Sequence, residues 1–214
     1  MSGNITRPDR ATATREAILS AAERLFAEYG VVAISNRQVS EAAGQGNNAA
    51  VGYHFGTKTD LVRAIVRKHT APIEAHRMRL LAEHHDSTLL PDWISCLVRP
   101  VTEHFADLGS PSWFARFGAQ VMTDPTLRPI MYEESLTSPS LLRTIEGMNR
   151  CLPDLPPHVR RERNDMGRHL IVHVCAEFER ALADGTPEPR ANWHECGTGL
   201  IDAIVGMWQA PVTR

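Results

Sequence analysis

The sequence has few cysteines, and they are not spaced for a metal site or a disulfide framework. Its 214 residues include four, Cys96, Cys151, Cys175 and Cys196, and no two form a C-x-x-C pair. Structural zinc sites and disulfide-rich folds need closely spaced or regularly paired cysteines. We therefore predict no metal, no cofactor and no disulfide, which suits a reducing compartment.

Long apolar runs are also missing. No stretch of about 18 consecutive apolar residues occurs, so we predict no membrane-spanning helix and no membrane partner. The first sixteen residues, MSGNITRPDRATATRE, are polar and lack the apolar run of a signal peptide. Hydrophobic residues make up 43% of the chain, as in ordinary globular proteins. Together these features predict a soluble, cytoplasmic protein.

The motifs of common catalytic sites are absent as well. The chain contains no GxSxG, no GxxxxGK[ST], no HExxH, and no GxGxxG after a strand-like segment. His169 and His173 are one helical turn apart, a spacing able to hold a metal, but no third ligand stands out. We predict that the protein is not an enzyme. The alternative is an all-α, metal-dependent enzyme, which metal analysis of untagged protein would detect.

Charge is unevenly distributed along the chain. Residues 1–70 contain nine Lys/Arg and six Asp/Glu, so 9 − 6 = +3, whereas residues 71–214 contain fourteen and nineteen, so 14 − 19 = −5. A basic segment joined to an acidic one is expected if only the first meets phosphates. Chance segregation on a solvated surface is the alternative.

The apolar residues recur at helical intervals almost throughout, which predicts an all-α fold. Residues 1–11 look like a flexible, partly basic arm. Helices are expected at 13–29, 35–43, 48–53, from 57 through Val66, 71–86, 91–108, 111–122, 127–135, 138–151, 157–184 and 192–209. Pro72 is placed in the first turn of the helix over 71–86, where its missing N–H has no cost.

The helices over 35–43 and 48–53 are joined by a short Gly-containing turn, as in a helix-turn-helix. The first opens with a Ser35-x-x-Gln38 capping box. An exposed helix that enters the major groove needs small or hydrogen-bonding residues at its N-terminal end. Here that end carries Gln45, Asn47, Asn48, Ala49 and Ala50. The pattern favours DNA reading, although Asn47 could instead cap its own helix.

Residues 15–66 resemble the DNA-binding domain of the TetR family of transcriptional regulators. The resemblance rests on landmarks that agree in order and at nearly the same spacing: Ile18-Leu19, Ala21-Ala22, Leu25-Phe26, Gly30, Val39, Ala42-Ala43-Gly44, Tyr53-His54-Phe55, Lys58 and Leu61. It covers about a quarter of the chain. It implies a head over 1–57 and a helical effector-binding and dimerisation domain over 58–214.

The resemblance also implies what the protein does and which residues do it. It implies a homodimeric, ligand-responsive repressor that binds a near-palindromic double-stranded DNA operator and a small-molecule effector. The residues that would face bases are Gln45, Asn47, Asn48 and Ala49. Those that would face phosphates are Ser35, Arg37, Tyr53, His54, Thr57 and Lys58. Ser35 could serve only as a helix cap, and Tyr53 or His54 only in packing. A DNA-binding protein without small-molecule control is a further alternative.

Two positions depart from the family pattern. Gly44 and Phe55 are eleven residues apart rather than ten, which adds one residue to the turn or to the start of the third helix. Gly52 stands where the family usually has a tyrosine that touches DNA. Either Tyr53 takes over that contact or the contact is missing.

Two further sets of residues are expected in the C-terminal domain. Aromatic and polar residues in the middle helices could line an apolar pocket or fill an ordinary core: Trp93, His104, Phe105, Trp113, Phe117, Gln120 and Tyr132. Apolar stripes on the last two long helices could form a four-helix dimer interface or face the internal core. The residues chosen for that interface are Leu170, His173, Val174, Ile204 and Trp208.

Overall fold

The computed structural model describes residues 7–186 and 188–213, and the regular elements in that part of the chain are all α-helices. The predicted all-α fold is confirmed. The helices are α1 (Arg7–Tyr29), α2 (Asn36–Ala42), α3 (Ala50–Phe55), α4 (Lys58–His84), α5 (Leu90–Leu108), α6 (Phe114–Thr123), α7 (Arg128–Leu136), α8 (Pro139–Cys151), α9 (Pro157–Asp184) and α10 (Trp193–Gln209). None of the helices in the described residues is long and apolar enough to cross a membrane.

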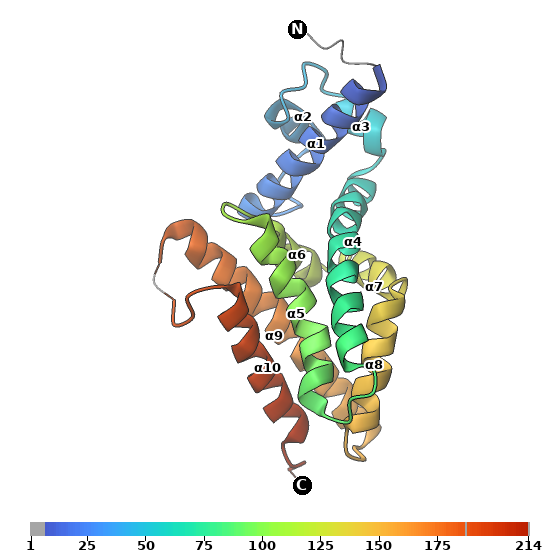
Figure 1. Ribbon diagram of the computed structural model, residues 1–214. Helices are drawn as coiled ribbons and strands as arrows, with labels where there is room; N and C mark the ends of the chain where they lie inside the picture. Colours follow the sequence, from blue (N-terminus) through green and yellow to red (C-terminus); the bar gives the residue numbers. More distant parts are fainter. Residues whose placement is uncertain (1–6, 187, 214) are drawn as a thin grey trace, which may run out of the picture.

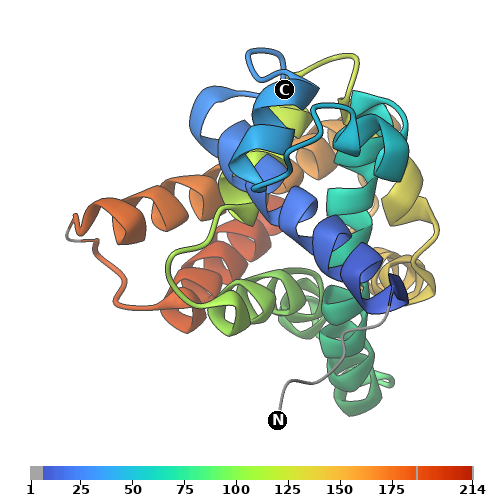
Figure 2. The ribbon, with the colours of Figure 1, turned by 90° about the horizontal axis from the view of Figure 1, so that it is seen from above.

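The first three helices form a head at one end of the molecule. Figure 1 shows α1, α2 and α3 gathered there, with α4 running from them into the body that α5 to α10 form. Seen from above, the head lies over the helices of the body (Figure 2). The contact is direct, because α1 packs against α6 and the rings of Phe26 and Phe117 stack 6.3 Å apart. One buried apolar cluster therefore continues from head to body.

Helix α1 begins earlier than the sequence predicts. It starts at Arg7, so residues 7–11 are helical rather than part of a flexible arm, and residues 1–6 lie outside the described residues. Pro8 is compatible with this start, because a proline in the first turn of a helix removes an N–H that has no helical partner. The segment Arg10 to Glu16 has only Ala11 and Ala13 as apolar residues, so it lacks the apolar helical period that predicts a helix.

Helix α4 is continuous where two helices are predicted. It runs 27 residues from Lys58 to His84, and Pro72 lies inside it rather than in a first turn. A proline inside a helix removes one i→i−4 hydrogen bond and costs about 3 kcal/mol. The helix continues because α4 packs against α1, α3, α5, α7 and α8. Tertiary packing thus overrides the local break.

A second proline inside a helix is compensated by a side chain. Pro100 lies within α5, so the carbonyl of Cys96 has no i+4 N–H to bond. The Nε of Arg77, from α4, donates to that carbonyl at 3.2 Å. Arg77 thereby satisfies a buried acceptor that would otherwise be unpaired, and it ties α4 to α5.

The last helix buries two residues that the sequence placed in a dimer interface. Ile204 is 0% and Trp208 2% exposed, and α10 packs against α5 and α9. The placement of these two residues in the interface is wrong, because α10 turns this stripe inward. Arg163 reinforces the arrangement by donating from Nη1 to the carbonyl of Trp208 at 2.8 Å.

Candidate nucleic-acid interface and effector cavity

Helix α2 is fixed at both ends. Ser35 caps its start, because the Ser35 hydroxyl accepts from the Gln38 backbone N–H and the Gln38 side chain accepts from the Ser35 N–H. The predicted capping box is therefore confirmed. At the other end Gly44 adopts a φ of +68°, a left-handed conformation that favours glycine and lets the chain leave the helix. Val39 is fully buried and holds α2 on the core.

The turn between α2 and α3 spans residues 43–49, and α3 starts at Ala50. The Ser40 hydroxyl is buried and donates to the carbonyls of Asn36, at 3.1 Å, and Asn48, at 3.4 Å. Val51 is fully buried. The buried Ser40 hydroxyl and Val51 therefore hold the turn on the core, while the outer residues of the turn remain at the surface.

Two of the four predicted base-reading residues have their side chains engaged in the turn. The Asn47 Oδ1 accepts from the Ala49 backbone N–H at 2.9 Å, which is a turn contact and not a cap of α3, because the N-cap of α3 is Ala49 and has no side-chain hydrogen bond. The Gln45 Nε2 donates to the Ala43 carbonyl at 3.0 Å. Asn48 and Ala49 are exposed, and the side chain of Asn48 has no hydrogen bond within the described residues. Asn48 is thus the amide best placed to meet a base edge.

The outer face of α3 carries an exposed aromatic beside a glycine. Tyr53 is 86% exposed, and its ring contacts the ring of His54 edge-on at 5.1 Å. Tyr53 is therefore not a core residue. A Cβ at Gly52 would meet no atom within 4 Å, so the missing family tyrosine leaves open space on this face. Arg15 supports α3 from behind, since its Nη1 donates to the His54 carbonyl at 2.8 Å.

Three of the predicted phosphate-facing residues also have local structural tasks. Ser35 caps α2, and Thr57 caps α4 through a reciprocal pair of hydrogen bonds with Asp60. Arg37 is exposed, and its Nε lies 2.8 Å from Glu41 Oε1. The Asp60 carboxylate already occupies the N-terminal end of α4, and the hydrogen bonds from Thr57 hold the pKa of Asp60 below its usual range. An anion at that helix end would have to compete with Asp60.

Lys58 connects the start of α4 to the loop before α2. Its Nζ donates to the carbonyl of Val31 at 3.0 Å and to that of Ile34 at 2.5 Å. An ammonium has three N–H donors, so one remains for a phosphate. Sequence reasoning assigned Lys58 a phosphate contact alone. The structure adds that Lys58 positions the segment that leads into α2.

A buried chain of polar groups joins the head to the body. His69 Nε2 lies 2.9 Å from Glu23 Oε2 on α1, and His69 Nδ1 lies 2.8 Å from His104 Nε2 on α5. All three residues are at most 6% exposed. Burial, followed by the neighbouring imidazoles of His69 and His76, lowers the pKa of His104 to about 4. A neutral His104 that donates to His69, which in turn donates to the Glu23 carboxylate, satisfies each bond.

The body contains a partly open cavity of about 200 Å³ beside α4. Its wall comes from α4 to α9 and is mostly apolar. The apolar lining includes Val66, Ile73, Phe105, Phe114, Met131, Leu141 and Ile171, and the polar lining includes Thr70, Arg77, Glu134, Ser135 and Ser138. A second cavity of about 330 Å³ shares Leu141 and Ile171 with the first and continues towards α10.

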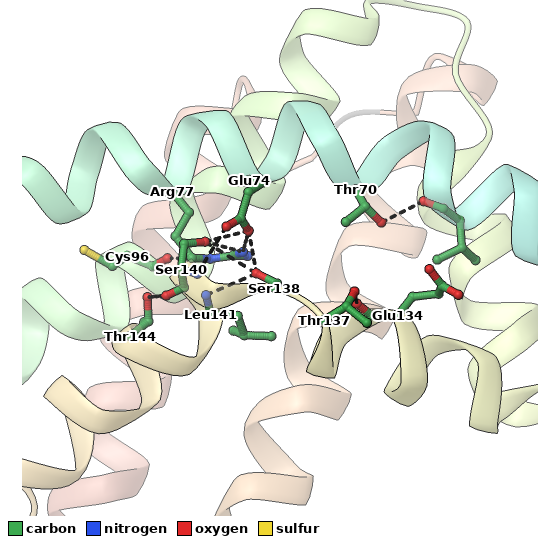
Figure 3. A network of polar contacts seen from close by, with 11 residues as sticks. Thr70, Glu74, Arg77, Cys96, Glu134, Thr137, Ser138, Ser140, Leu141 and Thr144 are labelled. Atoms are coloured by element: carbon green, nitrogen blue, oxygen red, sulfur yellow. Dashed lines mark hydrogen bonds and ion pairs between the residues drawn. The ribbon is translucent and has the colours of Figure 1, made fainter.

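A polar network lies along the cavity between α4 and the start of α8 (Figure 3). Glu74 accepts from the Ser140 backbone N–H at 3.1 Å and from the Ser140 hydroxyl at 2.6 Å, and also from the Ser138 hydroxyl. Burial pushes the pKa of Glu74 upward, but these hydrogen bonds outweigh it and leave the pKa below its usual range. Burial also lowers the pKa of Arg77, on the next turn of α4.

Glu134, which is outside the predicted sites, links α7 to the part of α4 that is nearest the head. Glu134 is 7% exposed, and its two oxygens accept from Arg63 Nη1 and Arg67 Nε, each at 2.8 Å. The hydrogen bonds from Arg67 and Arg63 hold the pKa of Glu134 below its usual range. Only the helical spacing of Arg63 and Arg67 hinted at a shared partner, and nothing in the sequence identified that partner as Glu134.

The structure brings two of the seven predicted pocket residues to a cavity wall. Phe105 lines the first cavity and Tyr132 the second. Trp93 and Phe117 are instead core residues, at 2% and 0% exposure. The indole of Trp93 fills the space that a side chain at Gly147 would need, since a Cβ there would lie 2.2 Å from the ring.

The other three predicted pocket residues lie elsewhere. His104 belongs to the buried chain with His69. Trp113 is half-buried at the start of α6 and lines a shallow cleft with Lys68. Gln120 is exposed at the junction of head and body, next to Gly30. A single sequence cannot separate pocket from core here, because aromatic residues serve both.

The remaining residues of the predicted dimer interface lie on an accessible face of α9. Leu170 is half-buried, His173 is exposed, and Val174 is 39% exposed. Met166, at 45% exposure, extends the same stripe by one turn. The rings of His169 and His173 are 6.0 Å apart on this helix. Among the described residues, no group of three or more metal-ligating side chains is placed to hold an ion.

Comparison with known proteins relates this chain to bacterial regulators. Residues 18–65 match the model of the family "Bacterial regulatory proteins, tetR family". The HTH-type transcriptional repressor AcnR of Corynebacterium glutamicum is 35% identical over 68 residues, which are 32% of this chain and 36% of AcnR. The chain thus aligns with about a third of the length of this curated relative.

Solved structures extend the likeness to the whole fold. A variant of HlyIIR superposes with a TM-score of 0.60 at 14% identity, over 94% of this chain and 99% of its own. The multidrug binding protein EbrR, complexed with imidazole, superposes with a TM-score of 0.50 at 20% identity, over 100% of both chains. At these identities the likeness concerns the arrangement of the helices.

Proposed function

We propose that the chain belongs, by its helix-turn-helix domain, to the TetR family of bacterial regulatory proteins and that it is a ligand-responsive transcriptional repressor. The observation that carries the proposal is the exposed surface formed by the turn and α3. Within the described residues the side chain of Asn48, in the turn, makes no hydrogen bond, and Tyr53, on α3, is 86% exposed. An asparagine amide can pair with adenine through two hydrogen bonds. Phosphate contacts from Tyr53, Arg37 and Lys58 would set the register.

The proposed functional unit is a homodimer on a near-palindromic operator. Two heads related by a two-fold axis would read half-sites about 34 Å apart in successive major grooves. The face proposed to pair with its copy is the α9 stripe Met166, Leu170 and Val174, which recurs every four residues and is exposed or half-buried. Burying such a stripe against a second copy would remove apolar surface from water.

The proposed regulation uses the cavity beside α4. The EbrR structure contains a small molecule, imidazole, in a protein of the same fold. In this chain α4 lines the cavity and also begins at Lys58, which holds the loop before α2. A ligand that prefers one position of α4 would therefore favour one position of the head, as a population shift requires.

The test is selection of bound duplexes from a random DNA pool at near-physiological salt. Enrichment of a two-fold symmetric sequence supports both DNA reading and the dimer. The double variant Asn48→Ala/Tyr53→Ala, with a circular dichroism spectrum like that of the original, is the matched control and should enrich nothing. No enrichment by the folded original protein would contradict the proposal. Enrichment of a site that no small molecule releases would favour a repressor without ligand control.

A further inference from the structure

The polar groups on the cavity wall indicate the chemical class of the ligand. Arg77 lines the cavity and is only 5% exposed. One of its five N–H donors is used structurally, because Nε satisfies the Cys96 carbonyl that Pro100 leaves without a partner. The two terminal nitrogens of the guanidinium remain to be accounted for.

These terminal nitrogens are poorly satisfied. Nη1 lies 3.5 Å from the Ser140 hydroxyl and 3.7 Å from Glu74 Oε2, both long for a charged hydrogen bond. Nη2 makes no hydrogen bond within the part of the chain that the structure describes. Nη2 is not one of the buried atoms left without a partner in the described residues, so it is open to the cavity that Arg77 lines. A ligand that supplies an acceptor there would gain a hydrogen bond to a charged donor.

Glu74 does not supply it, although it is the nearest carboxylate. The Glu74 oxygens accept from the Ser138 and Ser140 hydroxyls and the Ser140 N–H, so they are directed at the first turn of α8. Figure 3 shows Glu74 and Arg77 reaching from α4 towards that turn, with Leu141 beside them. Glu74 therefore offsets the charge of Arg77 at a distance without completing its hydrogen bonds.

Glu134, the other charged residue on the cavity wall, does not favour a cationic ligand. Both oxygens of Glu134 are already bonded, to Arg63 and Arg67 at 2.8 Å. The rest of the lining is mainly apolar and includes Ile73 and Phe105. We propose that the cavity binds a small apolar carboxylic acid, with its carboxylate on the terminal nitrogens of Arg77 and its hydrocarbon part against that lining. This inference rests on the proposed ligand-responsive repressor and adds the class of its ligand.

The first test compares octanoate with octanamide, which differs by loss of the negative charge, in isothermal titration of the unmodified protein. We expect octanoate to bind about ten- to a hundredfold more tightly, because hydrogen bonds to charged groups exceed neutral ones. Equal affinity for the two, or no binding of straight-chain acids from hexanoate to dodecanoate, would overturn the proposal.

Two variants locate the binding. Arg77→Gln keeps a donor within reach of the Cys96 carbonyl but removes the charge, and it should lose the preference for octanoate over octanamide. Arg79→Gln is the matched control, since Arg79 lies two residues away with its side chain 58% exposed, and it should retain the preference.

Gly118→Leu tests independently whether octanoate occupies the cavity volume. Gly118 lines the cavity, and a Cβ there meets no atom within 4 Å, so the leucine should block binding while Arg77 stays intact. Unchanged octanoate binding in folded Gly118→Leu would contradict this location.

Release of the selected DNA separates this inference from the proposed function. If octanoate releases the duplex and octanamide does not, both are supported. If acids have no effect but a cationic dye such as proflavine releases the duplex, the ligand class is wrong and the regulated repressor stands. If the protein binds no duplex sequence at all, the proposed function is wrong, whatever the cavity binds.

Discussion

Replacing Lys58 by methionine separates the two tasks that this residue performs. Met keeps the apolar stem and the helical preference but removes the ammonium that bonds the Val31 and Ile34 carbonyls at 3.0 and 2.5 Å. Bonds to a charged group contribute about 1.5–3 kcal/mol each when buried. Lys58 is half-buried and water can replace it at both carbonyls, so we expect a total loss of about 2 kcal/mol in the free energy of unfolding.

The effect on DNA binding follows from the third donor and from the position of the loop. Lys58→Met should weaken binding to every sequence by about tenfold or more, and a lost phosphate contact should reduce the salt slope by about one unit. Fluorescence anisotropy over a salt series measures both quantities, and urea denaturation measures the stability. Lys68→Met is the control: Lys68 lies further along α4, its Nζ is 3.6 Å from Glu23, and its loss should leave the slope unchanged. Weakened binding with an unchanged slope would refute the phosphate contact and leave positioning only. Unchanged binding and stability would refute both tasks.

Three further predictions concern the reading surface, the core and the buried histidines. Asn48→Ala should relax sequence choice at one or two base pairs by about 1–3 kcal/mol, measured as relative affinities for single-base variants of the selected site; an unchanged preference would remove Asn48 from the reading surface. Trp208→Ala should lower the unfolding free energy by about 3–5 kcal/mol in urea, since the ring is buried; a loss below 1 kcal/mol would contradict its place in the core. Burial lowers the pKa of His104 in the folded state to about 4, against about 6.5 for a histidine in water, so the unfolded state binds more protons between these values and stability should fall as the pH drops from about 6.5 to about 4. The loss attributable to His104 should approach 3 kcal/mol, taken as the difference in pH dependence between the original and His104→Gln, and parallel curves for the two would contradict a buried neutral imidazole.

The helices could be predicted from the sequence wherever periodicity and caps agree. The helix over 157–184 has the same bounds in the structure, and Gly185 ends it in a left-handed conformation. The capping boxes at Ser35 and Thr57 likewise fix the starts of α2 and α4. These signals are local, and they were sufficient because the residues that make them are adjacent in the chain.

What could not be predicted depends on contacts between distant residues. The continuity of α4 through Pro72 requires the packing of several helices, and the inward turn of Trp208 depends on where α5 lies. The Glu23, His69 and His104 chain joins residues 46 and 35 positions apart. The candidate cavity combines side chains from six helices, so of the predicted pocket residues only Phe105 lines it, and Tyr132 lines the second cavity.

The bond between Arg77 and the Cys96 carbonyl has a consequence for how this sequence can change. While position 100 is proline, Arg77 serves the fold, and selection for stability retains it whatever the ligand is. Any other residue at position 100 would restore the backbone N–H, which could then bond the Cys96 carbonyl within the helix. The hydrogen bond from Arg77 would no longer be needed. Position 77 would then be free to vary with ligand chemistry alone. Positions 77 and 100 should therefore change together among descendants of this sequence, with the proline lost before or along with the arginine.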